Sequence, residues 1–172
     1  YCNQELQKRA TAMANGETYK YSDEDMQMGG SVQSTQDGRI VAVIGGHNYK
    51  SGDLNKATVK QQPGSSIKPI LDYGMAYKYL DWCTGHTVKD EPIEAGIKNW
   101  DNQFHGSMTI SEALENSWNI PAYTTFQEVK KVAGSKNLTE DLESLGIDMS
   151  DQDPDLPDSY AIGGWSTGVS PV

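Results

Sequence analysis

The sequence has 172 residues and a formal net charge of −10 at pH 7, from 14 Lys and Arg against 24 Asp and Glu. A chain of this length can bury a hydrophobic core, but its acidic balance argues against a nucleic-acid partner, because neutralising phosphates requires clustered basic side chains. The two cysteines, Cys2 and Cys83, have no metal-ligand spacing, and the sequence predicts neither a metal site nor a cofactor.

Membrane and export signals are also missing from the sequence pattern. The longest strongly apolar run, Ile40 to Ile44, is far too short to span a bilayer. The N-terminal residues lack the basic and then apolar order of a signal peptide. We therefore expect any membrane anchor or export signal to lie outside this chain.

A helix and a hairpin are predicted in the first part of the chain. Apolar residues recur at helical spacing over residues 6–13, which favours an amphipathic helix ending near Gly16. A β-hairpin follows, in which Asp37-Gly38 supplies the two positive-φ residues of a tight turn. The short apolar run at 40–44 forms its buried second strand.

Helices dominate the prediction for the rest of the chain. Apolar residues recur at helical spacing as far as Leu80, so a helix starts within the sequence PGSSIKP at 63–69. Residues 84–106 are turn-rich and aperiodic, which indicates a long irregular excursion. Three more helices are expected: one capped by the box TISE at 109–112, one with Pro121 in its first turn and Gly134 at its end, and one with Leu138, Leu142 and Leu145 on its apolar face. Periodicity alone thus predicts a helix-rich α+β chain.

The sequence PGSSIKP carries a candidate nucleophile and a candidate base. Ser65 and Lys68 are three residues apart, so in a helix their Oγ and Nζ atoms lie on one face. A serine hydroxyl reacts at neutral pH only when a neighbouring group accepts its proton, and a lysine can do so when desolvation lowers its pKa. The alternative is that Ser65 caps the helix and Lys68 is solvated, and this short pattern by itself favours that alternative.

A second polar motif, SWN at 117–119, lies between two predicted helices. On a constrained loop, the Ser117 hydroxyl can relay a proton while the Asn119 carboxamide holds a substrate amide. The alternative is a polar turn between helices with Trp118 in the core. The two motifs together favour a catalytic site more strongly than either does alone.

Both motifs lie within longer segments that resemble one known family. The segments VQSTQDGRIVAVIGGHNY, QQPGSSIKPI, NWDNQFHGSMTISEALENSWNIPAY and AIGGWSTGVSPV are similar to the transpeptidase domain of class A penicillin-binding proteins, the bifunctional cell-wall synthases of bacteria. The resemblance extends over nearly the whole chain and is loosest in the N-terminal helix. It implies an α+β fold with an antiparallel sheet packed between helices and a mainly helical lobe. It also implies a location on the extracytoplasmic face of the bacterial membrane.

The resemblance implies a role for each motif residue. Ser65 would be the nucleophile acylated by the penultimate D-Ala of a peptidoglycan stem peptide, with Lys68 as its proton acceptor. Ser117 would pass the proton toward the departing D-Ala, and Asn119 would bind the amide of the donor peptide. The substrate would contact Ser65, Trp118 and Asn119. β-Lactams would mimic the D-Ala-D-Ala end and remain as an acyl-enzyme on Ser65.

The sequence departs from the family in one respect. The family's third motif, Lys-Thr-Gly or a close variant on a sheet strand, does not occur in it. We therefore expect residues 1–172 to be the N-terminal and helical portion of the transpeptidase domain, C-terminally incomplete and without the later strands. Two alternatives to a D,D-transpeptidase stay open: a β-lactamase or β-lactam sensor of the same fold, and a non-catalytic binding or scaffold module.

Overall fold

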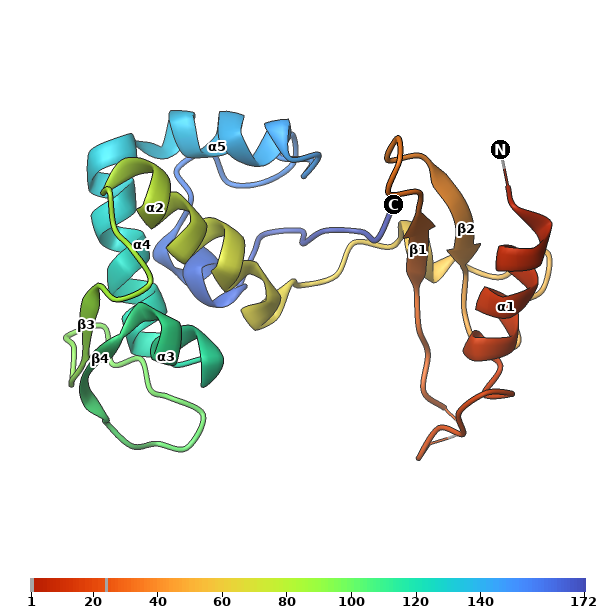
Figure 1. The fold of residues 1–172 in the computed structure, drawn as a ribbon, viewed down its shortest axis with the longest axis horizontal. Helices are drawn as coiled ribbons and strands as arrows, with labels where there is room; N and C mark the ends of the chain where they lie inside the picture. Colours follow the sequence, from red (N-terminus) through yellow and green to blue (C-terminus); the bar gives the residue numbers. More distant parts are fainter. Residues whose placement is uncertain (1, 24) are drawn as a thin grey trace. The chain divides into compact units, whose positions relative to one another are not determined.

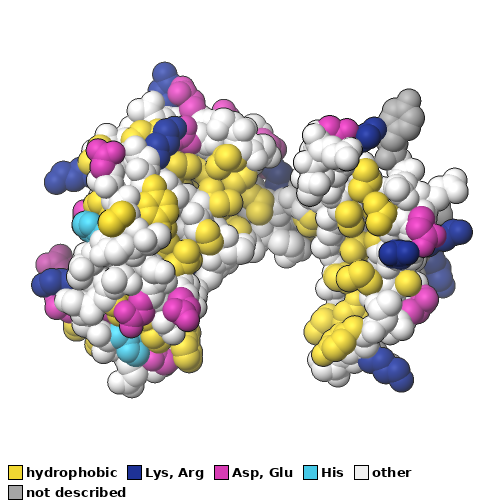
Figure 2. All heavy atoms as spheres, in the orientation of Figure 1, with side chains coloured by type: hydrophobic (Ala, Val, Ile, Leu, Met, Phe, Trp, Pro, Cys, Tyr) yellow, Lys and Arg dark blue, Asp and Glu magenta, His cyan; other side chains and the backbone are white. Residues whose placement is uncertain are grey.

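A computed structural model describes residues 2–23 and 25–172, and the chain forms two compact units (Figure 1). Unit 1 comprises the residues up to 61 together with 169–172, and unit 2 comprises residues 62–168. On the face drawn in Figure 2, the Asp and Glu side chains are spread over both units rather than gathered in one patch. Among the described residues, no helix combines the length and the hydropathy needed to cross a bilayer.

Unit 1 consists of a helix packed on a two-stranded hairpin. Helix α1 (Gln4–Ala14) is capped by Asn3, whose side chain accepts hydrogen bonds from two backbone N–H groups of the first turn. Strands β1 (Gly30–Gln33) and β2 (Ile40–Ile44) pair antiparallel, and the short 3₁₀ helix η1 (Lys56–Thr58) follows. The side chain of Gln7 joins helix to hairpin, because its amide exchanges two hydrogen bonds with the backbone of Val43. The predicted helix and hairpin are both confirmed.

The hairpin turn differs from the prediction. Only Gly38 of the Asp37-Gly38 pair has a positive φ, at 72°. The connection is longer than a two-residue turn, since the Ser34 N–H donates to the Arg39 carbonyl and the Gly38 N–H donates to the Ser34 carbonyl. A longer loop reverses the chain with a single left-handed residue, so Asp37 does not need to adopt that conformation.

Unit 2 is mainly helical and is built around the 15-residue helix α4. Its apolar face carries Phe126 and Val129, both fully buried, against the neighbouring helices. The elements of the unit, in chain order, are η2 (Gly64–Ile67), η3 (Pro69–Gly74), α2 (Met75–Tyr79), β3 (Thr87–Asp90), β4 (Gly106–Thr109), α3 (Ile110–Glu115), α4 (Asn119–Ala133), α5 (Ser135–Ser144) and η4 (Asp158–Ile162) (Figure 1).

The predicted helices of unit 2 are present, with one apolar position misplaced. Pro121 lies in the first turn of α4, and Gly134 ends that helix with a φ of 76°. In α5, Leu138 and Leu142 are fully buried, as their spacing predicts. Leu145 is 61% exposed, because it is the C-cap residue of α5 and no longer follows the helical periodicity.

The excursion at 84–106 contains a hairpin that the sequence pattern does not show. Strands β3 and β4 pair antiparallel, with Thr87 opposite Thr109 and Asp90 opposite Gly106. Helix α3 begins directly after β4, and the Thr109 hydroxyl accepts the Glu112 N–H at 3.2 Å, which is one of the two hydrogen bonds of the predicted capping box. The prediction of an irregular segment holds for residues 91–105, which contain no helix or strand, but it missed β3 at 87–90. The two short strands carry few apolar residues and pair only across this long connection.

Candidate active site

The segment that carries Ser65 and Lys68 is a broken helix rather than a regular one. It runs from the 3₁₀ turn η2 through the π-helical segment η3 into α2. Pro69 has no N–H, so it cannot donate to the carbonyl of Ser65, which accepts the N–H of Lys68 instead. Gly74 allows the wide π turn, since a Cβ there would lie 2.8 Å from the Pro69 carbonyl oxygen. Segments of π-helix are frequently found at functional sites.

A loop near the end of unit 2 packs against the start of this broken helix. The sequence pattern does not predict this contact. Gly163 packs so closely on Gly64 that a Cβ at Gly163 would lie 2.2 Å from the Gly64 Cα. The side chain of Gln62 also exchanges two hydrogen bonds with the backbone of Trp165. The segment AIGGW therefore fixes the turn that immediately precedes Ser65.

The two serines of the motif differ in their surroundings. Both are exposed, but the Ser66 hydroxyl donates to the Pro63 carbonyl at 2.6 Å. Within the described part of the chain, no hydrogen bond links the Ser65 hydroxyl to Lys68 Nζ. Ser65 thus has an accessible hydroxyl that no local hydrogen bond occupies. The hydroxyl of the neighbouring Ser66, by contrast, is occupied by its hydrogen bond to the Pro63 carbonyl.

The amine of Lys68 joins the two motifs. Lys68 is fully buried, and its Nζ lies 2.7 Å from the Ser117 carbonyl oxygen and 2.8 Å from Asn119 Oδ1. Longer contacts of 3.3 Å reach Ser117 Oγ and the Trp118 carbonyl oxygen. The structure therefore brings together Lys68, Ser117 and Asn119, which are about 50 residues apart in sequence.

Burial sets the protonation of this amine. It lowers the pKa of Lys68 from 10.5 to about 8, and the charge of Asp72 partly opposes this effect. Asp72 is fully buried, its carboxylate oxygens have no hydrogen-bond partner among the described residues, and burial raises its pKa well above the usual value. A neutral Lys68 amine has two N–H groups for its two shortest contacts and keeps a lone pair that can accept a proton.

Ser117 is held in an unusual backbone conformation. Helix α3 ends in a Schellman motif, in which the Ser117 N–H donates to the Leu114 carbonyl and the Trp118 N–H donates to the Ala113 carbonyl. Ser117 has a φ of 55° and occupies the left-handed position that glycine usually takes in this motif. Backbone strain of this kind is concentrated at functional sites, so the conformation of Ser117 agrees with the predicted role of its side chain.

The side chain of Trp118 is buried in a stack of rings. Only 7% of Trp118 is exposed, and its ring stacks on His105 at a centroid distance of 3.9 Å and on Trp100 at 5.5 Å. Trp100 is 70% exposed, and its indole N–H donates to the Asn116 carbonyl. Trp118 therefore packs in the core, as the structural alternative predicted, and its contact with substrate stays a prediction.

Comparison with known sequences assigns the chain to a family. The sequence profile described as the penicillin binding protein transpeptidase domain matches residues 28–167. The chain belongs to the penicillin-binding protein transpeptidase family. The match includes both motifs, so the buried Lys68 and the SWN turn (residues 117–119) lie within the region that defines the family.

Individual relatives and solved structures agree with this assignment. Penicillin-binding protein 1A/1B of Bacillus subtilis is 33% identical over 96% of this chain, and penicillin-binding protein 1F of the same organism is 33% identical over 97%. The chain spans only 18% and 23% of the lengths of these two relatives. PonA1 of Mycobacterium tuberculosis, in a structure with penicillin V, matches 95% of this chain and 46% of its own with a TM-score of 0.74. At 19% identity, this likeness shows the fold alone.

Proposed function

We propose that this chain carries the nucleophile and the proton acceptor of a peptidoglycan D,D-transpeptidase, an acyltransferase that cross-links stem peptides. The observation that carries the proposal is the Lys68 amine, which is fully buried and bound to both polar residues of the SWN turn. No carboxylate of the described residues lies within ion-pair distance of this amine, although the charge of Asp72 acts on it from farther away. A buried lysine without an ion pair is suited to accept a proton rather than to stabilise the fold.

In the proposed reaction, Ser65 Oγ attacks the carbonyl carbon of the penultimate D-Ala. The neutral Lys68 amine accepts the hydroxyl proton, and Ser117 passes a proton to the amine of the departing D-Ala, which leaves an ester on Ser65. An acceptor amine then attacks that ester, forms the new peptide bond and releases the Ser65 hydroxyl. The absence of a Ser65–Lys68 hydrogen bond is compatible with this role, because catalytic hydrogen bonds often tighten only when substrate binds.

Asn119 has two tasks in this proposal. Its Oδ1 atom accepts from Lys68, and its Nδ2 donates to the Lys98 carbonyl at 2.9 Å. Binding the donor peptide's amide requires the same carboxamide, and the fixed orientation of the side chain prepares it for this contact. Any contact of Trp118 with the peptide would be made by its small exposed part, because its ring stacks on His105 and Trp100. The protein would act outside the cytoplasm, held at the membrane by a segment outside this chain.

Labelling with a fluorescent penicillin tests the proposal in the full-length native protein. Wild type should form a covalent adduct, and peptide mass spectrometry should locate it on Ser65. Ser65→Ala should abolish labelling, whereas the matched control Ser66→Ala should retain it, because the Ser66 hydroxyl is bound to the Pro63 carbonyl. Labelling that survives in Ser65→Ala and disappears in Ser66→Ala would overturn the assignment.

The lifetime of the adduct separates the alternatives. A stable adduct that persists for hours supports a transpeptidase. Rapid return to unmodified protein would indicate a β-lactamase, since a hydrolase must deacylate quickly. A folded protein that forms no adduct would indicate a non-catalytic binding or scaffold module.

A further inference from the structure

Two buried polar side chains outside both motifs lie next to the SWN turn. Asp90 ends strand β3 and is fully buried, and Asn99, in the loop that follows, is 3% exposed. The Oδ1 atom of Asn99 accepts from the backbone N–H groups of Asn119, at 2.8 Å, and Ile120, at 3.4 Å. Its Nδ2 donates to Asp90 Oδ2 at 2.7 Å and to the Gln103 carbonyl at 2.9 Å. The Asn99 carboxamide therefore links β3 to the first residues of α4.

Asn99 supplies the cap that α4 lacks in its own sequence. The N-cap position of α4 is Trp118, whose side chain makes no capping hydrogen bond. The first N–H groups of a helix have no partner within the helix, so a polar atom from elsewhere must satisfy them when they are buried. Asn99 does this from 20 residues upstream. Together with the Lys98 carbonyl, which accepts from Asn119 Nδ2, it holds both the backbone and the side chain of Asn119.

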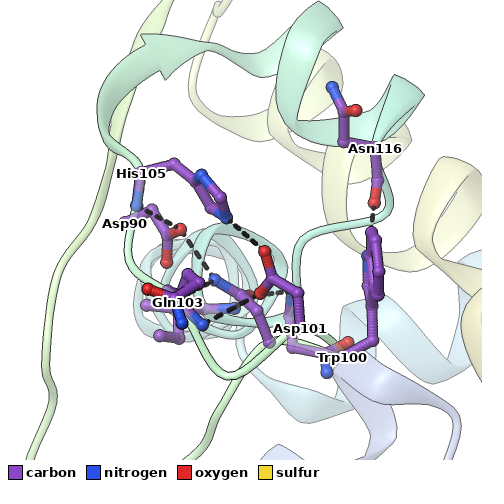
Figure 3. A network of polar contacts seen from close by, with 9 residues as sticks. Asp90, Trp100, Asp101, Gln103, His105 and Asn116 are labelled. Carbon is purple, nitrogen blue, oxygen red and sulfur yellow. Dashed lines mark hydrogen bonds and ion pairs between the residues drawn. The ribbon is translucent and has the colours of Figure 1, made fainter.

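Asp90 sets the orientation of the Asn99 carboxamide. Its Oδ2 accepts from Asn99 Nδ2 and also from the backbone N–H of His105 at 2.9 Å, as Figure 3 shows for Asp90 and His105. The pairing of β3 with β4 places Asp90 opposite Gly106, which brings His105 within reach. A flipped Asn99 amide would turn its oxygen toward the carboxylate and its NH₂ toward the α4 N–H groups, so only one orientation satisfies both sides.

We propose that Asp90 and Asn99 are positioning residues for the acyl transfer proposed above. They hold Asn119 in place, and Asn119 Oδ1 in turn holds the Lys68 amine at 2.8 Å. Losing this support shifts Asn119 at the start of α4, and misplacement of a catalytic constellation by about 1 Å can slow a reaction roughly 10²-fold. The inference rests on the proposed function for its kinetic consequence, but its effect on Lys68 does not depend on catalysis.

An exchange of the two side chains gives the sharpest test. In Asn99→Asp, two carboxylates face each other in a buried site, so the second-order rate of acylation by fluorescent penicillin should fall at least about tenfold. In Asp90→Asn combined with Asn99→Asp, the amide at residue 90 can donate an N–H to the new carboxylate, which removes the repulsion between two carboxylates. The same NH₂ then faces the His105 N–H, because Asp90 Oδ2 accepts from both Asn99 and His105 in the wild type. The new carboxylate accepts from Asn119 and Ile120. The double variant should therefore recover part of the lost rate and acylate faster than Asn99→Asp alone, although it regains neither the His105 contact nor the hydrogen bond to the Gln103 carbonyl.

Asn99→Ala and a matched control separate positioning from general destabilisation. Asn137→Ala removes a side-chain hydrogen bond of 2.8 Å to Ala133, at the opposite end of α4. Asn99→Ala removes two hydrogen bonds to the start of α4 and two more to Asp90 and Gln103, whereas Asn137→Ala removes one hydrogen bond at the other end of the helix. Only Asn99→Ala should slow acylation. It should also move the acid limb of the rate-against-pH profile to lower pH, because a loosened Asn119 stabilises the charged Lys68 less.

The pKa of Lys68, measured by NMR titration of ¹⁵N-labelled lysine in the full-length protein, gives a readout that needs no acylation. It should fall in Asn99→Ala and stay unchanged in Asn137→Ala. Unchanged Lys68 titration in Asn99→Ala, or an exchange variant that acylates no faster than Asn99→Asp alone, would overturn the inference. A wild type that forms no adduct on Ser65 would refute the proposed function instead, and the Lys68 titration would still decide the positioning role.

Discussion

Replacing Ser117 by glycine should separate the stability of the fold from its activity. An L-residue in the left-handed region costs roughly 1–2 kcal/mol, and Ser117 has a φ of 55° at a position typical of glycine. Glycine removes this strain but loses about 0.5–1 kcal/mol more backbone entropy on folding. Ser117→Gly should therefore be about 0.5–1 kcal/mol more stable than Ser117→Ala. Urea unfolding of the two variants, compared at equal m-values, measures this difference.

Acylation of the same two variants completes the test. Both lack the hydroxyl that is proposed to relay the proton, so both should react with fluorescent penicillin about 10²-fold or more slowly than wild type. Glu128, an exposed residue in the interior of helix α4, is the control position. There glycine should be less stable than alanine by about 1 kcal/mol, the opposite sign. If Ser117→Gly proves less stable than Ser117→Ala, the backbone is not strained at this residue.

Three further predictions concern the surroundings of the site. In the proposed role, Lys68 accepts the Ser65 proton only as a neutral amine, so the acylation rate should fall about tenfold for each pH unit below its pKa of about 8. A constant rate over that range would exclude this role. Burial raises the pKa of Asp72, so ionised Asp72 lowers the free energy of unfolding increasingly as pH rises above its usual pKa of 3.8. Asp72→Asn should therefore raise the thermal unfolding temperature at neutral pH, and this increase should disappear near pH 4. No increase at neutral pH would show that Asp72 is not destabilising. Gly163→Ala should destabilise the fold by about 2 kcal/mol or more and reduce penicillin labelling, because its Cβ would lie 2.2 Å from the Gly64 backbone. Gly164→Ala, whose nearest contact would be 3.3 Å, should be tolerated better, and equal losses in the two variants would contradict the packing argument.

The sequence was informative wherever structure depends on local spacing. The periodicity of apolar residues predicted α1 and α4, and Gly134 marked the end of α4 correctly. The resemblance of the two motif segments to one family also implied that both motifs belong to one site. The direct contacts of Lys68 with Ser117 and Asn119 were not predicted from the sequence and come from the structure.

Local spacing failed where partners are distant in the chain. The β3–β4 hairpin was missed because strand pairing depends on the partner strand, which lies beyond a long connection. The regular helix predicted after PGSSIKP is broken into 3₁₀, π and α segments, because Pro69 removes one donor and Gly74 permits a wider turn. Pro69 and Gly74 can both be read from the sequence, but their combined effect on the backbone hydrogen bonds of the helix could not be predicted from it.

The sequence by itself determined the chemical groups of this site: a serine hydroxyl, a lysine amine and the polar side chains of the SWN turn. Only the tertiary structure decided their state. It buries Lys68 and so lowers its pKa, and it forces Ser117 into a left-handed conformation. It also places Asn99 at the start of α4, which no local pattern indicates. The burial of Lys68, the strain at Ser117 and the capping of α4 by Asn99 all depend on contacts between distant segments. Only the folded structure determines these contacts.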